Sequence, residues 1–167
     1  MEKTLIIGYG NLDRQDDGVA YHILTSVAQQ LNREISDLEE SFSNLENGDP
    51  AFLFSLQLTP ETAEIAAGFD RLCFVDCHTG SVDEDLHVEK VAAEFQRSPL
   101  THHMTAQTCM VLVEQVYHKQ PEAVLISVRG YQFEFVRGLS ESTAILAQQA
   151  AQEIVRWYRR EPVANLL

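Results

Sequence analysis

Five titratable residues mark three places where an apolar segment ends and a polar one begins: Asp16, Asp17, Asp76, His102 and His103. The aspartate pair follows a glycine turn, the third aspartate ends an apolar run, and the paired histidines precede a segment with helical spacing. Carboxylate oxygens and imidazole nitrogens are donors suited to Zn, Ni, Mn and Fe. If the three places meet, two carboxylates and an imidazole form an open site, with positions left for a ligand or for a metal brought by a partner.

Each of these residues also has an ordinary structural interpretation. Asp16 or Asp17 can accept hydrogen bonds from the free N–H groups at a helix start. One carboxylate is enough for that, so we expect Asp16 to cap the helix and Asp17 to be presented to something else. Asp76 can simply begin a turn, and one of the two histidines can be solvated. Acid–base chemistry by two aspartates without a metal also stays open.

The turn that precedes the aspartate pair contains Gly8, Gly10 and Asn11, and its glycines allow backbone angles that other residues avoid. It is not the Gly-x-Gly-x-x-Gly of dinucleotide-binding folds, because Asp13 occupies the position of the third glycine. The sequence also lacks a Walker phosphate loop and the Gly-x-Ser-x-Gly elbow of serine hydrolases. A pair of Cys109 with a histidine is conceivable, although Cys109 lies on the apolar stripe of a predicted helix.

The spacing of apolar residues predicts alternating strands and helices. Continuous apolar runs are typical of strands buried on both faces. These runs occupy residues 5–7, 51–56, 71–76 and 123–128. Steps of three and four predict helices, at residues 19–31, 60–68, 105–117 and 141–158. Thr59 and Ser140 are the expected caps of the second and the last of these helices, and Gly68 is the expected end of the second. Short alternating stretches predict further strands around 86–91 and 131–136, and an acidic connection spans 34–49.

This order of elements predicts one α/β domain over residues 1–167. The expected architecture is a three-layer α/β/α sandwich, with a mostly parallel sheet of about five strands and helices on both faces. In such a sheet, strand-to-helix junctions can converge on one edge, so the three places that carry the titratable residues can form one site.

Composition narrows the class of partner. The net charge of −13 argues against a nucleic acid, whose phosphates are bound mainly by Lys and Arg. No apolar run approaches the roughly 20 residues that cross a bilayer, and residues 1–3 lead straight into a strand rather than into a secretory signal. We therefore expect a cytoplasmic protein with no nucleic-acid or membrane partner.

With these residues in view, the sequence resembles the hydrogenase maturation endopeptidases, which remove the C-terminal extension from the large subunit of nickel–iron hydrogenases. The resemblance covers nearly the whole chain, and its most specific part is the glycine–asparagine turn with the acidic pair. The matching motifs are Ile6-Ile7-Gly8-Tyr9-Gly10-Asn11, Asp16-Asp17-Gly18, Phe74-Val75-Asp76, Thr101-His102-His103-Met104 and Gly138-Leu139-Ser140. The stretch 57–61 and the paired histidines most resemble members that serve bidirectional, NAD-linked hydrogenases.

The resemblance implies a metal-binding triad of Asp17, Asp76 and His102, with His103 as the second choice for the histidine ligand. It implies that this triad recognises nickel already installed in the large-subunit precursor, so that the substrate supplies the metal. Cleavage would then follow nickel insertion. A metal-dependent endopeptidase with a protein substrate is the expected function, and we expect a monomer.

The sequence departs from the family at two places. Asp17 stands where members often have Glu, which is one methylene longer, and residues 56–59 replace the Asp-Gly-Gly-Thr stretch of many members. Two other functions are open. A non-catalytic assembly factor would bind the metal-loaded precursor without cutting it. A small-molecule hydrolase or nucleotide-binding domain would need a closed pocket and a phosphate-binding turn, and carboxylates at the helix start disfavour phosphate.

Overall fold

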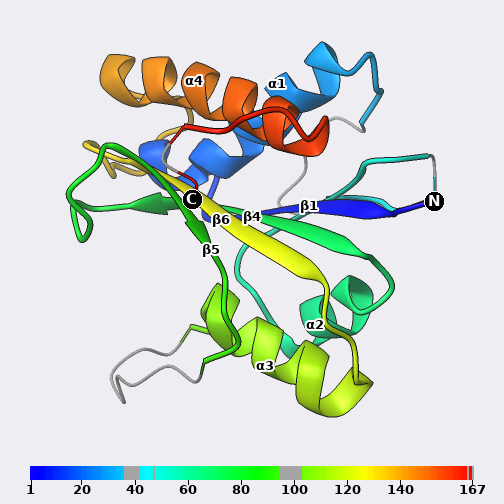
Figure 1. Cartoon of the computed structure of the whole chain (residues 1–167). Coiled ribbons are helices and arrows are strands. Elements are labelled where there is room, and N and C mark those ends of the chain that lie inside the picture. Colours follow the sequence, from blue (N-terminus) through cyan, green and yellow to red (C-terminus); the bar gives the residue numbers. More distant parts are fainter. Residues whose placement is uncertain (36–41, 47, 95–102, 165, 167) are drawn as a thin grey trace.

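The computed structural model describes residues 1–35, 42–46, 48–94, 103–164 and 166. Its middle layer is a six-stranded sheet in the order β2-β3-β1-β4-β6-β5 (Figure 1). Four neighbouring strands are parallel: β3 (Ala51–Ser55), β1 (Thr4–Tyr9), β4 (Arg71–His78) and β6 (Glu122–Arg129). Antiparallel strands form the two edges, namely β2 (Phe42–Asn44) and β5 (Leu86–Lys90). The predicted mostly parallel sheet is confirmed, with one strand more than expected because β2 lies in the acidic connection.

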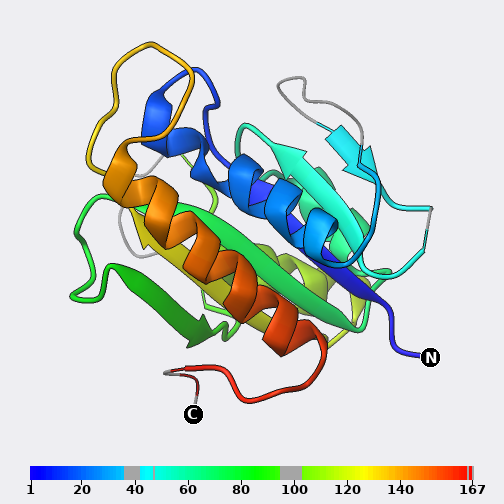
Figure 2. The ribbon, with the colours of Figure 1, turned by 90° about the horizontal axis from the view of Figure 1, so that it is seen from above.

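Helices cover both faces of the sheet, as predicted. On one face lie α1 (Val19–Gln30) and α4 (Glu141–Tyr158); on the other lie α2 (Pro60–Ala66) and α3 (Ala106–Tyr117) (Figures 1 and 2). The alternation of side chains along β1 explains the three layers. Ile6 packs into the core beneath α1 and α4, whereas Leu5 and Ile7 pack into the core beneath α2 and α3. Within the described residues, no helix has both the length and the apolar composition needed to cross a membrane.

Side-chain caps stabilise three helix starts. Thr59 caps α2 in a capping box with Thr62, and a proline follows as the first helical residue. The Ser140 hydroxyl accepts a hydrogen bond from the backbone N–H of Thr143 at the start of α4. Thr105 accepts in the same way at the start of α3. These caps satisfy N–H groups that lack partners within the helix.

The order of the parallel strands places a crevice at the carboxyl ends of β1 and β4. From β1 the chain passes through α1 to β3 on one side, and then returns through α2 to β4 on the other side. Ligands of open α/β sheets bind where connections leave in opposite directions in this way. The segment after β1 carries Asp17, and β4 carries Asp76. Both predicted carboxylates therefore lie at the same edge.

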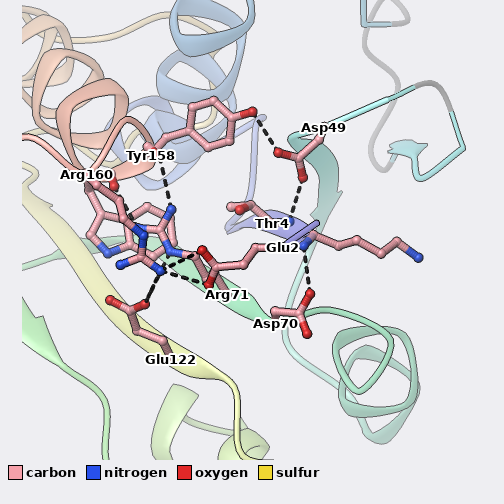
Figure 3. A network of polar contacts seen from close by, with 10 residues as sticks. Glu2, Thr4, Asp49, Asp70, Arg71, Glu122, Tyr158 and Arg160 are labelled. Carbon is pink, nitrogen blue, oxygen red and sulfur yellow. Dashed lines mark hydrogen bonds and ion pairs between the residues drawn. The ribbon is translucent and has the colours of Figure 1, made fainter.

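A polar network around Arg71 lies at the start of β4, at the end of the parallel strands opposite the crevice (Figure 3). Arg71 is only 3% exposed, and its guanidinium lies 4.0 Å from the centre of the Trp157 ring. It donates to the carbonyl oxygens of Trp157 at 2.7 Å and Tyr158 at 3.0 Å, and pairs with Glu122 at 3.3 Å. The network fixes the end of α4 against the sheet, at the end of the strands opposite the crevice.

Candidate functional site

The turn after β1 depends on Gly10. Its φ of +148° is strained for other residues, and a Cβ there would lie 2.0 Å from the carbonyl oxygen of Asp17. This close approach lets the backbone N–H of Asn11 donate to the Asp17 carboxylate at 2.8 Å. Gly8, which we expected in the turn, lies instead inside β1. A Cβ there would press against Leu24 of α1 at 3.0 Å, so Gly8 serves helix–strand packing.

Asp16 does not cap helix α1, and our prediction of that role is wrong. A 3-10 turn, η1 (Gln15–Gly18), precedes the helix, whose N-cap is Gly18 with no side-chain hydrogen bond. The Asp16 side chain is fully buried and turns toward the segment between β6 and α4. Its two oxygens accept five hydrogen bonds of 2.7–3.0 Å, from the backbone N–H groups of Tyr131, Gln132 and Ser140 and from the hydroxyls of Ser140 and Thr143.

These hydrogen bonds also explain why the strand predicted at 131–136 is absent. The N–H groups of Tyr131 and Gln132 donate to Asp16 rather than to a neighbouring strand, and the segment is an irregular loop. Burial raises the pKa of Asp16, but the hydrogen bonds from Ser140 and from the backbone of Tyr131 outweigh it and leave the pKa below its usual value. Asp16 is therefore an ionised anchor for this loop.

Asp17 and Asp76 line one open pocket of about 610 Å³ at the carboxyl edge of the sheet. Its walls come from the turn after β1, the segment after β3, the end of β4 and the start of α3. The lining residues are Tyr9, Gly10, Asn11, Arg14, Asp17, Leu56, Gln57, Leu58, Asp76, His103, Met104, Thr105, Ala106, Gln107 and Leu125. The pocket is partly open to solvent and can admit a peptide segment, and its volume also lies within the range of small-molecule sites.

Asp76 has the most strongly perturbed carboxyl group of the pocket. Burial raises its pKa to about 7, and the charge of Asp17 contributes in the same direction. Hydrogen bonds from the backbone N–H of Cys77, at 2.7 Å, and from the Tyr9 hydroxyl partly oppose this shift. A carboxyl group with a pKa near neutrality can both take and give a proton at the pH of a cell.

Tyr9 is a pocket residue that we did not predict. Burial and the neighbouring charge of Asp76 raise its pKa well above the usual value, so its hydroxyl remains protonated and donates to Asp76. Gly8 pairs with Val75 in the register of β1 and β4, which places the next residues, Tyr9 and Asp76, side by side. In the sequence, Tyr9 is recognisable only as the residue that ends the first strand. Its place beside Asp76 can be predicted only once β1 and β4 are known to be neighbours.

His102, the predicted imidazole ligand, lies outside the described residues, so its role stays a prediction. His103, the second choice, is exposed at the pocket and its Nδ1 forms a hydrogen bond with the side-chain oxygen of Gln57. Among the residues that the structure describes, no group of three or more His, Cys, Asp or Glu side chains is placed to hold a metal ion. Asp17 and Asp76 by themselves supply carboxylate oxygen donors only, and an imidazole donor, the type that suits nickel, has to come from another residue.

The cysteines do not offer a nucleophile. Cys109 is buried on the core side of α3, and burial raises its pKa to about 12. Burial also raises the pKa of Cys77, and the adjacent Asp76 charge adds to the shift. Both thiols therefore stay protonated near neutral pH, and the thiol form is a poor nucleophile. The Cys109–histidine alternative is disfavoured for this reason.

The raised pKa of Asp76 predicts how stability changes with pH. Because the pKa rises from 3.8 to about 7 on folding, the folded chain keeps a proton that the unfolded chain releases. This group therefore lowers the free energy of unfolding progressively as pH rises from about 4 to about 7, and the loss is complete above that range. Asp76→Asn removes the titration. Its free energy of unfolding relative to wild type should be about 2–3 kcal/mol higher at pH 8 than at pH 5.

Urea unfolding of both proteins with a chelator present, at the two pH values, measures this difference. The conservative amide keeps an acceptor for Cys77 and Tyr9, so the comparison isolates the charge. The same mutant–wild-type difference at both pH values would contradict the assigned shift.

Solved structures of hydrogenase maturation proteases have the same fold. The hydrogenase maturating endopeptidase HybD from E. coli superposes with a TM-score of 0.71 at 14% identity, over 95% of this chain and 93% of that one. The [NiFe] hydrogenase maturation protease HycI from Thermococcus kodakarensis KOD1 superposes with a TM-score of 0.63 at 17% identity, over 95% of this chain and 93% of that one. The chain shares the fold of these proteases. A hydrogenase 2 maturation peptidase from a Thaumarchaeota archaeon superposes with a TM-score of 0.60 at 15% identity, over 96% of this chain and 100% of that one.

No protein-family model matches the chain, and a search of curated protein sequences found no match. At these identities the structural comparisons establish the α/β architecture.

Proposed function

We propose that this protein is an endopeptidase that removes the C-terminal extension of a nickel–iron hydrogenase large-subunit precursor after nickel insertion. The observation that carries the proposal is the pair Asp17 and Asp76 in one open pocket, at the crevice between β1 and β4. The pair belongs to motifs that resemble the maturation endopeptidases, and the fold is the one that those proteases have.

In this proposal the two carboxylates have different tasks. Asp17 is held in place by the Asn11 N–H and faces the pocket as a ligand for the nickel that the precursor carries. Asp76 is the second ligand or, with a pKa near 7, the group that takes a proton from the attacking water and returns it to the leaving amine. His102 completes the triad. Nickel bound in the precursor would supply electrophilic polarisation.

The test is a processing assay with purified precursor in nickel-loaded and nickel-free forms. We expect wild-type protein to shorten only the loaded precursor, and His102→Ala to abolish the shortening. His103→Ala is the matched control, since it removes an adjacent imidazole and should leave cleavage within a few-fold of wild type. Equal cleavage of both precursor forms would reject metal recognition.

The same assay separates the two classes of function. Binding of the loaded precursor without any cleavage, measured by co-elution, would favour the non-catalytic assembly factor. The proposed substrate within the class is the precursor of a bidirectional, NAD-linked hydrogenase, processed in the cytoplasm by a monomer. A precursor from another hydrogenase type, offered in the same assay, tests that choice.

A further inference from the structure

The loop of residues 131–138, called the rim loop below, lies between β6 and α4 and is held tightly although it has no regular structure. The Asp16 carboxylate accepts hydrogen bonds from two backbone N–H groups of this loop. Gln15 adds two more hydrogen bonds, from its backbone N–H to the carbonyl of Val136 and from the N–H of Glu134 to its side-chain oxygen, both at 2.9 Å. Arg137 forms an ion pair with Asp13 at 2.7 Å. The loop is therefore fixed against the turn that carries Asp17.

This well-anchored loop presents large apolar side chains to solvent. Phe135 is 82% exposed, Val136 54% and Tyr131 44%. Single exposed apolar residues are common, but a group of them on one ordered loop is typical of an interaction surface. A loop held by a buried carboxylate also loses little conformational entropy when a partner binds, which favours docking.

The rim loop is continuous with the pocket through Arg14. Arg14 lines the pocket, and its guanidinium lies 5.2 Å from the centre of the Phe135 ring. It also donates to the carbonyl of Phe133 at 3.4 Å. Figure 2 shows the loop, in yellow to orange, arching beside the blue segment that leads into α1. Phe135 therefore lies next to a residue of the pocket wall.

We propose that the rim loop is a docking surface for an apolar segment of the protein substrate whose scissile region enters the pocket. This inference rests on the proposed function. The occupant follows from continuity with the pocket: Arg14 both lines the pocket and lies over the Phe135 ring, so the segment bound on the loop belongs to the chain whose scissile region enters the pocket. Phe135 and Val136 bind the substrate in the ground state and in the transition state alike, so they set affinity rather than the rate of the chemical step.

The test compares Phe135→Ser, Val136→Ser and Val116→Ser with wild type. Val116 is a matched control for Val136: it is the same residue type, is 55% exposed, and lies at the end of α3 away from the pocket. We expect each rim-loop variant to raise KM, and the Kd for nickel-loaded precursor, about tenfold with kcat unchanged. The control variant should have the KM, Kd and kcat of wild type. Circular dichroism and urea unfolding establish that each variant is folded.

The outcomes separate this inference from the proposed function. If wild type cleaves and the rim-loop variants keep its KM and Kd, the docking surface is wrong and the protease stands. A fall in kcat at unchanged KM likewise overturns docking, because the loop would then act on the chemical step. If wild type binds precursor without cleaving it, the Kd comparison still decides the docking surface, while the protease function fails. No binding of precursor by folded wild type overturns both.

Discussion

Asp76→Asn and Asp17→Asn are each expected to reduce kcat/KM for nickel-loaded precursor by about 10²–10⁴, the range that positioned acid–base groups and essential ligands contribute. Each substitution keeps the size of the side chain and one acceptor oxygen. The Cys77 N–H can still donate at residue 76, and the Asn11 N–H at residue 17. The loss would therefore report the charge, not the shape of the pocket. A time course of precursor shortening, followed by gel or mass spectrometry, gives the rate constants.

Asp83→Asn is the control for these variants. Asp83 is exposed and does not line the pocket, so removal of its charge should leave kcat/KM within about twofold of wild type. Full-rate processing by either pocket variant would remove that carboxylate from the mechanism.

Asp16→Ala is expected to lower the free energy of unfolding by about 3–5 kcal/mol. The substitution removes the acceptor of five donors in the 131–143 segment, and three of them belong to the start of α4. The Thr143 hydroxyl also has the carbonyl oxygen of Arg129 as an acceptor. Asp16→Asn should also destabilise strongly, since its amide NH₂ group faces donors. Urea unfolding measures both changes.

Asp13→Ala gives the contrast for Asp16. Asp13 is half exposed and its partner Arg137 is 58% exposed, so loss of this surface ion pair should change stability little. The pKa of Asp16 lies below the usual value of an aspartate. Its ionised form therefore contributes fully to the free energy of unfolding above that usual pKa, and the contribution is lost as the pH falls through the lowered pKa. Equal stability of Asp16→Ala and Asp13→Ala would contradict the anchoring role.

The sequence by itself determined the elements whose signals are local. Buried apolar runs and steps of three and four defined the parallel strands and the helices, because both patterns report which sides of an element are covered. Thr59 and Ser140 marked helix starts since a cap contacts N–H groups only two or three residues away. Asp17 and Asp76 could be placed at one edge because parallel strands bring their carboxyl ends together.

The tertiary structure alone decided the roles that depend on distant partners. Asp16 and Asp17 are adjacent and chemically identical, yet one anchors the rim loop and the start of α4, 115–127 residues away, and the other faces the pocket. The alternation at 131–136 fits a strand, but its N–H groups pair with Asp16 instead. Tyr9 joins the site only through the register of β1 against β4. A local sequence pattern shows which hydrogen bonds a residue can form. Its actual partners depend on which distant segment the packed core places next to it.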